Sequence, residues 1–451
     1  MNQPSFVEQF VQWFQPAQIT RLAREVGWLV REGKINPFEF FVGLVFGQMS
    51  ALELTLSAQA SCYTEPVQRQ AVDQRYNQPA VELFRREFLC SVERSLAQTP
   101  KPSLTLDLAK HFDAVQLFDS TSYDCPESLA TVFPGCGGKA SSANCKVFLR
   151  YEYLRGQFQP LALLPGNCPD QGLAARLPSL LKANELALID KGFFKMQTLQ
   201  ELDQQKTFFL MPLSRSVGLW LARPNQSPPI EFNLADELRR TQENVIEWPK
   251  VFLGSQNGLC VRLTAFRLTQ ASADRRRALL RRQCQTKGRQ PTVVALELAG
   301  WLVLITNAPV DQLPTQVMSY LYRVRWQIEL IFKQCKSVLR LNVTQARQNP
   351  YRVQCEIWAR LIAAVVLFAW HSHLQAACSP KQEISFAQVA RKFQQQGTRL
   401  AHLLIGQGQH LYDELRLWWR NLLKTTLKGR QRTRKTTWEW LQDTWLNLAP
   451  A

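Results

Sequence analysis

The chain has 451 residues, of which 46% are hydrophobic and 20% charged, a composition typical of a globular protein that excludes a disordered or fibrous one. Its formal net charge of +18 favours an anionic partner, either nucleic acid or an acidic membrane surface. The excess lies in the C-terminal half, because residues 1–212 carry a net charge of −1, residues 213–310 one of +7 and residues 311–451 one of +12. This distribution indicates a neutral scaffold followed by basic elements.

The sequence shows no segment typical of export or of a membrane span. The N-terminus lacks a basic region followed by an apolar run, as in a signal peptide. The longest apolar run, Leu361–Trp370, has ten residues, against the roughly 20 that span a bilayer. The 11 cysteines form no Cys-x-x-Cys pair, which favours reduced thiols over a zinc or redox site. We therefore expect a cytoplasmic protein without a membrane partner.

The first half of the chain predicts helices followed by a mixed α/β region. Residues 1–104 show apolar residues at helical spacing, which predicts a helical region, with Thr99–Pro102 as a linker. Residues 105–212 alternate short apolar runs with helical patterns, which predicts a mixed α/β layer. The predicted strands are 115–122, 147–154, 159–164, 186–190 and 207–211, and the predicted helices are 173–183 and 194–203.

The second half predicts a β-rich segment between two helical ones. Residues 213–310 contain loop-forming prolines at 224, 228 and 229, strands at 244–252, 260–268 and 293–305, and a basic element that includes Arg275, Arg276 and Arg277. Residues 311–345 contain a predicted long helix, Leu313–Leu339, with Asp311 as a capping residue and Pro314 in the first turn. Residues 346–451 predict a basic helical region whose cations can contact DNA phosphates.

The long helix has two contrasting faces. Its apolar residues, such as Val317, Leu321 and Val324, fall on one side, and the opposite side carries Tyr322, Arg325, Glu329, Lys333 and Lys336. One interpretation is a solvated face with ion pairs between residues four apart. The other is a metal-binding carboxylate ringed by cations that bind phosphate. Asp119 and Asp190 end predicted strands, where an Asp is often only a turn former, but three such acids can bind two divalent cations.

These residues resemble the motifs of a known family. The run Tyr322-x2-Arg325-x3-Glu329-x6-Lys336 resembles the Tyr-Arg-Glu-Lys signature of hairpin-forming, cut-and-paste DDE transposases of the fourth insertion-sequence family. Asp119-Ser120-Thr121 resembles the first acidic motif of that family, and Asp190-Lys191-Gly192-Phe193 resembles the second. The run Trp301–Thr306 is similar to the strand that precedes the signature helix.

The resemblance implies an α/β fold, with an RNase H-like catalytic core that is interrupted by a β-rich insertion and flanked by helical regions. It implies that Asp119, Asp190 and Glu329 are catalytic ligands of Mg²⁺ or Mn²⁺. It also implies DNA contacts, with Arg325, Lys333 and Lys336 on phosphates at the transposon end, Tyr322 on a phosphate and Trp301 against a flipped base. Arg275, Arg276 and Arg277 are further candidates for phosphate contacts.

The resemblance further implies an enzyme that cleaves double-stranded DNA at inverted-repeat ends, forms hairpins and joins the ends to target DNA. Its partners would be that DNA and a second copy of the chain in a synaptic complex. Residues 1–104 would be a possible DNA-end-binding region, and residues 346–451 a region for DNA binding or dimerisation. Two alternatives remain open at this point. One is a transposase-derived DNA-binding protein without catalysis, and the other is an RNase H-like nuclease that only hydrolyses DNA.

Overall fold

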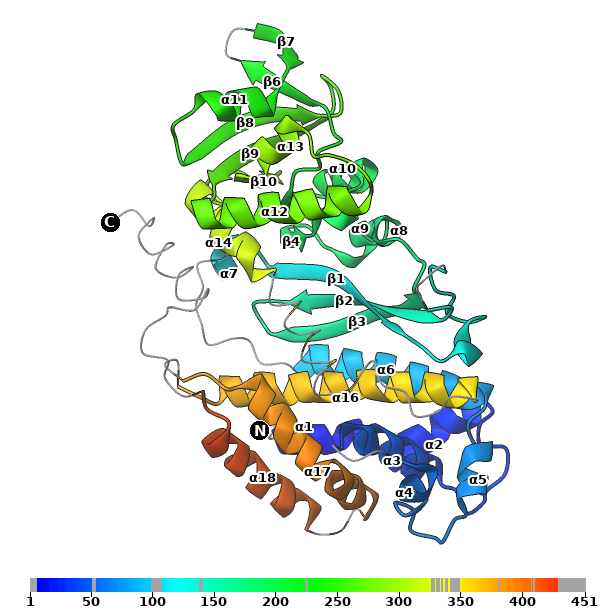
Figure 1. The fold of residues 1–451 in the computed structure, drawn as a ribbon. Coiled ribbons are helices and arrows are strands. Elements are labelled where there is room, and N and C mark those ends of the chain that lie inside the picture. The colour runs from blue at the N-terminus through cyan, green and yellow to red at the C-terminus, as the bar shows by residue number, and fades with distance from the viewer. Residues whose placement is uncertain are drawn as a thin grey trace. The chain divides into compact units, whose positions relative to one another are not determined.

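The computed structural model describes residues 6–50, 54–98, 108–137, 141–223, 226–325, 329, 333, 336, 340, 349–379, 382–406, 408 and 410–428. The chain forms two compact units, each assembled from segments that are distant in sequence (Figure 1). The described residues of unit 1 lie within 6–98, 120–168 and 329–428. Those of unit 2 lie within 108–119 and 169–325. The division into five regions along the sequence stays a prediction.

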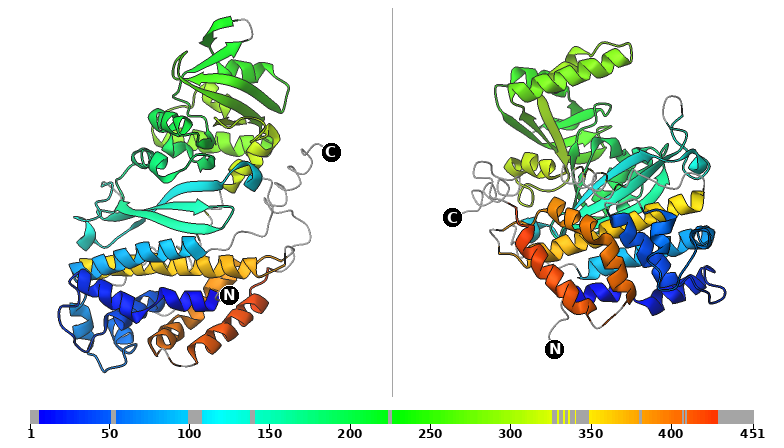
Figure 2. Two further views of the ribbon diagram at one scale, coloured as in Figure 1. Left: turned by 180° about the vertical axis from the view of Figure 1, so that it is seen from behind. Right: turned by 60° about the horizontal axis from the view of Figure 1, so that its bottom comes forward.

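Unit 1 is mainly helical and combines the two ends of the chain. Helix α16 packs against α6 and α3, and α17 also packs against α3, so the predicted N- and C-terminal helical regions share one core (Figures 1 and 2). The unit also contains the end of β1, the 3-10 helix η1 (Glu127–Leu129) and the antiparallel hairpin of β2 (Asn144–Glu152) and β3 (Gln157–Pro165). Its helices are α1 (Phe6–Trp13), α2 (Pro16–Glu25), α3 (Pro37–Met49), α4 (Leu56–Ala60), α5 (Arg69–Gln74), α6 (Gln78–Gln98), α16 (Pro350–Ala376), α17 (Phe386–Gly406) and α18 (Leu411–Thr425).

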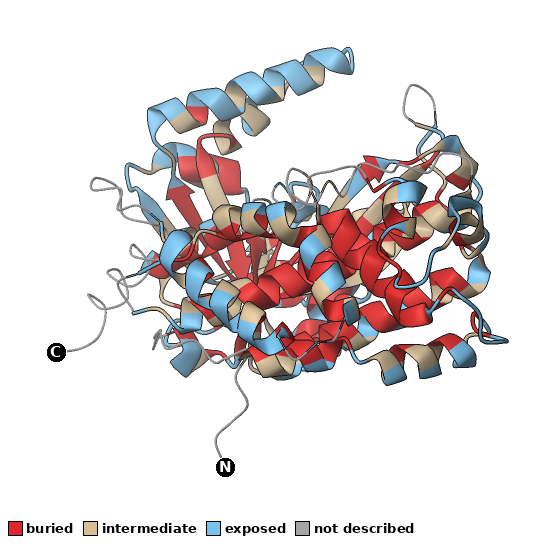
Figure 3. Cartoon of the chain, turned by 90° about the horizontal axis from the view of Figure 1, so that it is seen from below, coloured by how far each residue is buried: buried red, intermediate tan, exposed pale blue. Residues whose placement is uncertain are grey.

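Helix α16 is long and apolar enough to cross a membrane by length and composition. However, 94% of its most apolar window is buried inside the protein, as expected of a core helix (Figure 3). Its interior also contains charged residues with partners inside unit 1. Glu356 pairs with Arg352 at 3.1 Å, and Arg360 donates to Gln48 at 2.7 Å. Such pairing is what burial of charge requires.

Unit 2 is organised around a mixed sheet. Its strands follow the order β1-β4-β5-β10-β9-β8-β6-β7. Strands β1, β4 and β5 are parallel, and the remaining pairs are antiparallel. The strands are β1 (Ala114–Asp124), β4 (Glu185–Ile189), β5 (Phe208–Pro212), β6 (Leu219–Arg223), β7 (Gln226–Glu231), β8 (Val245–Leu253), β9 (Leu259–Arg267) and β10 (Trp301–Thr306).

The helices of unit 2 are short, with one surface exception. Helix α12 has 17 residues, of which only Ala273 is buried, and it lies on the outside of the unit (Figures 1 and 2). The helices are α7 (Leu108–His111), α8 (Asp170–Ala174), α9 (Leu177–Leu180), η2 (Lys191–Phe193), α10 (Met196–Gln204), α11 (Leu234–Arg240), α12 (Gln270–Thr286), α13 (Val293–Leu298) and α14 (Thr315–Val324). Together the two units confirm the predicted mixed α/β class.

Local predictions within residues 213–310 were wrong at two places. The apolar run 293–305 is not one strand, because Val293–Leu298 forms helix α13 before β10 begins. The Thr292 side chain accepts a hydrogen bond from the Ala295 N–H at 3.2 Å, and this N-cap starts the helix. The run at Pro228 and Pro229 is not a loop but part of β7. Strand β7 ends the sheet, where proline is tolerated because no neighbour needs its missing N–H.

Candidate active site

The two predicted catalytic aspartates lie beside each other in unit 2. Strands β1 and β4 are paired in parallel register up to Phe118 and Ile189, and Asp119 and Asp190 directly follow these two residues. Asp190 lies just beyond the end of β4, but Asp119 lies inside β1, which continues to Asp124, so the prediction that Asp119 ends a strand was wrong. The preceding residues are fully buried, so each strand carries its acid out of an apolar layer. Neighbouring parallel strands lie roughly 4.8 Å apart, and residues in register point to the same face. The register therefore brings the two carboxylates to the same edge of the core.

A single guanidinium confirms that the two carboxylates converge. Arg325 follows the last residue of α14; its Nη1 lies 3.9 Å from Asp119 Oδ2, and its Nη2 lies 3.6 Å from Asp190 Oδ1. The side chain of Arg325 is 9% exposed, whereas those of Asp119 and Asp190 are 19% and 37% exposed. The acids therefore face a more open region than the arginine that they bind.

The carboxylate of Asp190 is also oriented by its own backbone turn. Its Oδ2 accepts a hydrogen bond from the Gly192 N–H at 3.1 Å and caps the 3-10 helix η2. This local bond explains the Asp-Lys-Gly sequence, because the capping residue must be followed by a short turn. Asp190 thus acts as a turn former and as half of the acidic pair, so the two interpretations of this residue are compatible.

The polar face of α14 is not solvated in the part that the structure describes. Tyr322 and Arg325 are each 8% exposed, and the Arg325 guanidinium lies 5.7 Å from the centre of the Tyr322 ring. Burial raises the pKa of the Tyr322 hydroxyl, and the neighbouring Arg325 partly opposes this shift. The phenol is therefore neutral at ordinary pH and can donate a hydrogen bond.

The other signature residues belong to unit 1. Glu329, Lys333 and Lys336 are helical; Glu329 and Lys336 are half-buried, and Lys333 is exposed. Lys336 Nζ donates to the Ser122 carbonyl of β1 at 3.1 Å, and burial lowers the pKa of its ammonium group. Within the described ranges, no three His, Cys, Asp or Glu side chains form a metal-binding group. The assignment of Glu329 as the third acid therefore stays a proposal.

The predicted DNA contacts in 213–310 lie in different environments. Trp301 is only 3% exposed and its ring is covered by the Arg267 guanidinium at 4.3 Å, so its role in base stacking stays a prediction. Arg276 and Arg277 of α12 donate to the carbonyls of Trp301 and Leu296, at 2.8 and 3.2 Å. Arg275 is exposed, and its guanidinium lies 3.3 Å from the hydroxyl of Ser272 on the same helix.

The sequence reasoning missed two cations that line a cavity in unit 2. This cavity has a volume of about 430 Å³ and apolar walls that include Leu280, Leu298 and Leu302. Lys191, Arg215 and Arg276 also line it. Burial lowers the pKa of Lys191, and the positive charge of Arg215 lowers it further. Lys191 was visible in the motif after Asp190, whereas Arg215 had no sequence signal beyond its charge.

The acidic pair fits a divalent cation. Carboxylate oxygens are the ligands that Mg²⁺ and Mn²⁺ prefer. Asp119 and Asp190 already converge on one positive group, so their placement suits a shared cation. Both are partly exposed, which leaves access for an ion and a phosphate.

Comparison with known proteins gives the family. Residues 110–366 match the model described as the transposase DDE domain, which is more than half of the chain. The chain therefore belongs to the DDE-domain transposases. It is a DNA transposase, of the enzyme class that cleaves DNA, transfers strands and uses divalent metal ions.

Individual relatives agree with the family. The chain is 25% identical over 374 residues to the transposase of insertion sequence element IS231F from Bacillus thuringiensis subsp. israelensis, covering 79% of this chain and 78% of the relative. It is 26% identical over 377 residues to that of IS1151 from Clostridium perfringens, covering 78% and 77%. A piggyBac transposase synaptic complex with hairpin DNA is similar with a TM-score of 0.43 and 12% identity, over 94% of this chain and 88% of that one.

Proposed function

We propose that this transposase moves an insertion sequence by cutting it out of DNA through hairpin ends and joining it to a new site. The observation that carries the proposal is the pair of Asp119 and Asp190, which directly follow the paired segments of two neighbouring parallel strands and both contact Arg325 of the signature helix. In this proposal the described sheet of unit 2 contains an RNase H-like core, and the strands of 213–310 form its β-rich insertion.

Asp119, Asp190 and Glu329 would hold Mg²⁺ or Mn²⁺. When bound, such ions lower the pKa of an attacking water or hydroxyl and stabilise charge on the phosphate oxygens. Strand register fixes the backbone of Asp119 and Asp190, and the Gly192 N–H orients the Asp190 carboxylate, so these two residues would hold the ion in a defined place. Arg325, Lys333 and Lys336 supply positive charge for the DNA phosphates, and the neutral Tyr322 hydroxyl supplies a hydrogen-bond donor.

The proposed reaction is a series of in-line phosphoryl transfers. Water cleaves one strand at the 3′ end of the element, and the freed 3′-hydroxyl attacks the opposite strand to form a hairpin. A second water reopens the hairpin, and the 3′-hydroxyl then attacks target DNA. Each transfer breaks one phosphodiester bond and forms one bond to the attacking oxygen, so one set of acids serves every step. No covalent bond between protein and DNA is needed, unlike in a tyrosine recombinase.

Cations outside the Tyr-Arg-Glu-Lys signature would add further contacts with DNA phosphates. Lys191 and Arg215 lie with Arg276 around the cavity of unit 2, and Lys191 directly follows the catalytic Asp190. Arg275 is exposed and contacts a hydroxyl of its own helix, whereas Arg276 and Arg277 bond to backbone carbonyls. Two copies of the chain would hold the two ends of the element, in the cytoplasm of a bacterium, as suits the bacterial relatives.

The decisive experiment incubates the full chain with Mg²⁺ and DNA that carries the inverted repeats of its element. Denaturing gels should show nicks at the 3′ ends, followed by hairpin-capped ends. Nicks without hairpins would support the nuclease alternative, and binding without nicks would support the DNA-binding alternative. Repeating the assay with Mn²⁺ and Ca²⁺ identifies the ions that support cleavage.

A further inference from the structure

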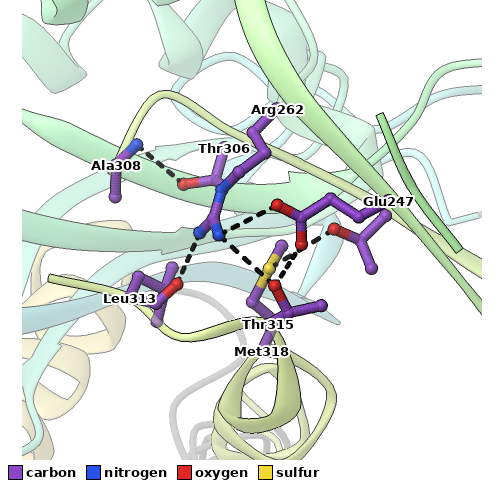
Figure 4. A network of polar contacts seen from close by, with 8 residues as sticks. Glu247, Arg262, Thr306, Ala308, Leu313, Thr315 and Met318 are labelled. Carbon is purple, nitrogen blue, oxygen red and sulfur yellow. Dashed lines mark hydrogen bonds and ion pairs between the residues drawn. The ribbon is translucent and has the colours of Figure 1, made fainter. Parts of the chain in front are cut away.

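A buried arginine from the sheet holds the start of the signature helix. Arg262 of β9 is 6% exposed; its Nη2 donates to the Leu313 carbonyl at 2.5 Å, and its Nη1 lies 3.5 Å from the Thr315 hydroxyl (Figure 4). These two residues flank Pro314, the N-cap of α14, which provides no side-chain cap. Asp311, the predicted capping residue, does not fill that position. The start of α14 is therefore fixed from β9.

Glu247 of β8 completes this network. One of its oxygens lies 3.4 Å from Arg262 Nη1, and the other accepts a hydrogen bond from the Thr315 hydroxyl (Figure 4). A carboxylate at this place also faces the positive end of the helix dipole. Arg262, Glu247 and Thr315 thus contact one another from three separate elements, so none of the three can shift without breaking a bond.

A second contact from β9 shows which face of α14 is docked. Thr264, two residues after Arg262 and on the same side of the strand, donates to Met318 Sδ at 3.6 Å. Thr315, Met318, Tyr322 and Arg325 are separated by three, four and three residues, which places them on one face of a helix. The face that β9 holds is therefore the face that carries Tyr322 and Arg325.

We propose that Arg262, Glu247 and Thr315 are positioning residues, which set the rotation and height of α14 and thereby the place where Arg325 meets Asp119 and Asp190. The ten residue steps from Thr315 to Arg325 span about 15 Å of helix, so a displacement at the start is transmitted to the guanidinium. An error of about 1 Å in such a group can cost about 100-fold in rate. This inference rests on the proposed function of the acidic pair.

The test uses Thr315→Val in the full chain, because valine matches threonine in shape and removes only the hydroxyl. Cleavage of an element end is measured in single turnover at saturating DNA with Mg²⁺, and end binding is measured separately. We expect the cleavage rate constant to fall about tenfold or more, while DNA affinity changes less than about twofold. Thr315→Ser, which keeps the hydroxyl, should restore the rate.

Thr306→Val is the matched control. Thr306 is buried on β10 opposite Arg262, but its hydroxyl bonds the Phe209 carbonyl and the Ala308 N–H instead of α14. Thr306→Val should lower the melting temperature as Thr315→Val does, and its cleavage rate should stay within about twofold of that of the original chain. Equal rate losses in the two variants, at a temperature where circular dichroism shows both folded, would overturn the positioning role.

A double variant tests whether the network acts through Arg325. Adding Thr315→Val to Arg325→Lys should cost less than a further twofold, because the group to be positioned is already altered. Rate losses that multiply would overturn the inference. If Asp190→Asn still cleaves DNA, the proposed site itself is wrong. If Asp190→Asn is inactive while Thr315→Val is fully active, only the positioning role fails.

Discussion

Two buried arginines lie at the two ends of α14 and differ in their contacts. At the start, Arg262 is held by a backbone carbonyl, a hydroxyl and a carboxylate from separate elements. At the end, Arg325 contacts two partly exposed carboxylates at 3.6 and 3.9 Å, distances of ion pairs rather than of tight hydrogen bonds. The first arrangement joins elements inside the fold, whereas the second includes carboxylates that are partly open to solvent. In the proposed function, these open carboxylates would receive the cation.

The largest effect should come from the two acids that contact Arg325 at the end of α14. Asp119→Asn or Asp190→Asn keeps the shape of the side chain but removes the charge that would hold the cation, and cleavage should fall more than about 1000-fold. DNA-end binding should persist in a mobility-shift assay. Asp203→Asn, the same change on α10 where the carboxylate bonds the Asn307 side chain, is the control and should remain active. Cleavage by Asp190→Asn would refute the acidic pair.

The next largest effect should come from changing the contact of Arg325 with the two aspartates. Lysine keeps the charge but has one nitrogen, so Arg325→Lys cannot contact both aspartates as the guanidinium does. Cleavage should fall about 10- to 100-fold. Because the lysine competes less well for the two carboxylates, Mn²⁺ should raise the melting temperature more in the variant than in the original chain. An equal or smaller rise would show that Arg325 does not compete with the cation.

The arginine run of α12 allows a comparison between an exposed arginine and one that bonds to a backbone carbonyl. Arg275→Ala should weaken DNA binding without lowering the melting temperature. The slope of log K against log salt concentration should become shallower by about one unit, as expected for the loss of one phosphate contact. Arg277→Ala removes the bond to the Leu296 carbonyl and should lower the melting temperature by several degrees. Identical outcomes for the two variants would contradict the division into exposed and anchoring arginines.

The smallest effect should come from Tyr322→Phe. The ring stays buried, so stability should change by about 1 kcal/mol or less, and loss of one neutral donor should weaken end binding only a few-fold. Binding is measured at two pH values within the neutral range, and the loss should be the same at both because the phenol is neutral there. A loss of binding as large as that of Arg325→Lys would show that the hydroxyl does more than donate one hydrogen bond.

Sequence reasoning found the acids because their placement is local. Asp119 and Asp190 each directly follow a short run of apolar residues, and such a run can be recognised from composition alone, although β1 continues past Asp119 to Asp124. It could not find Arg262 or Glu247, because each is a lone charge within a strand whose partners come from other elements. Likewise the run 275–277 does not reveal which arginines bond to carbonyls, since that depends on how α12 lies on its neighbours.

The register of β1 and β4 has a consequence for how this chain tolerates change. The separation of the two acids depends on the number of residues in each strand, since both follow the pair Phe118 and Ile189 directly. Exchanging one apolar residue for another leaves that number unchanged, but deleting a single residue from either strand would turn one carboxylate to the opposite side of the sheet. Insertions and deletions should therefore be far rarer than substitutions here when functional variants are selected from a random library.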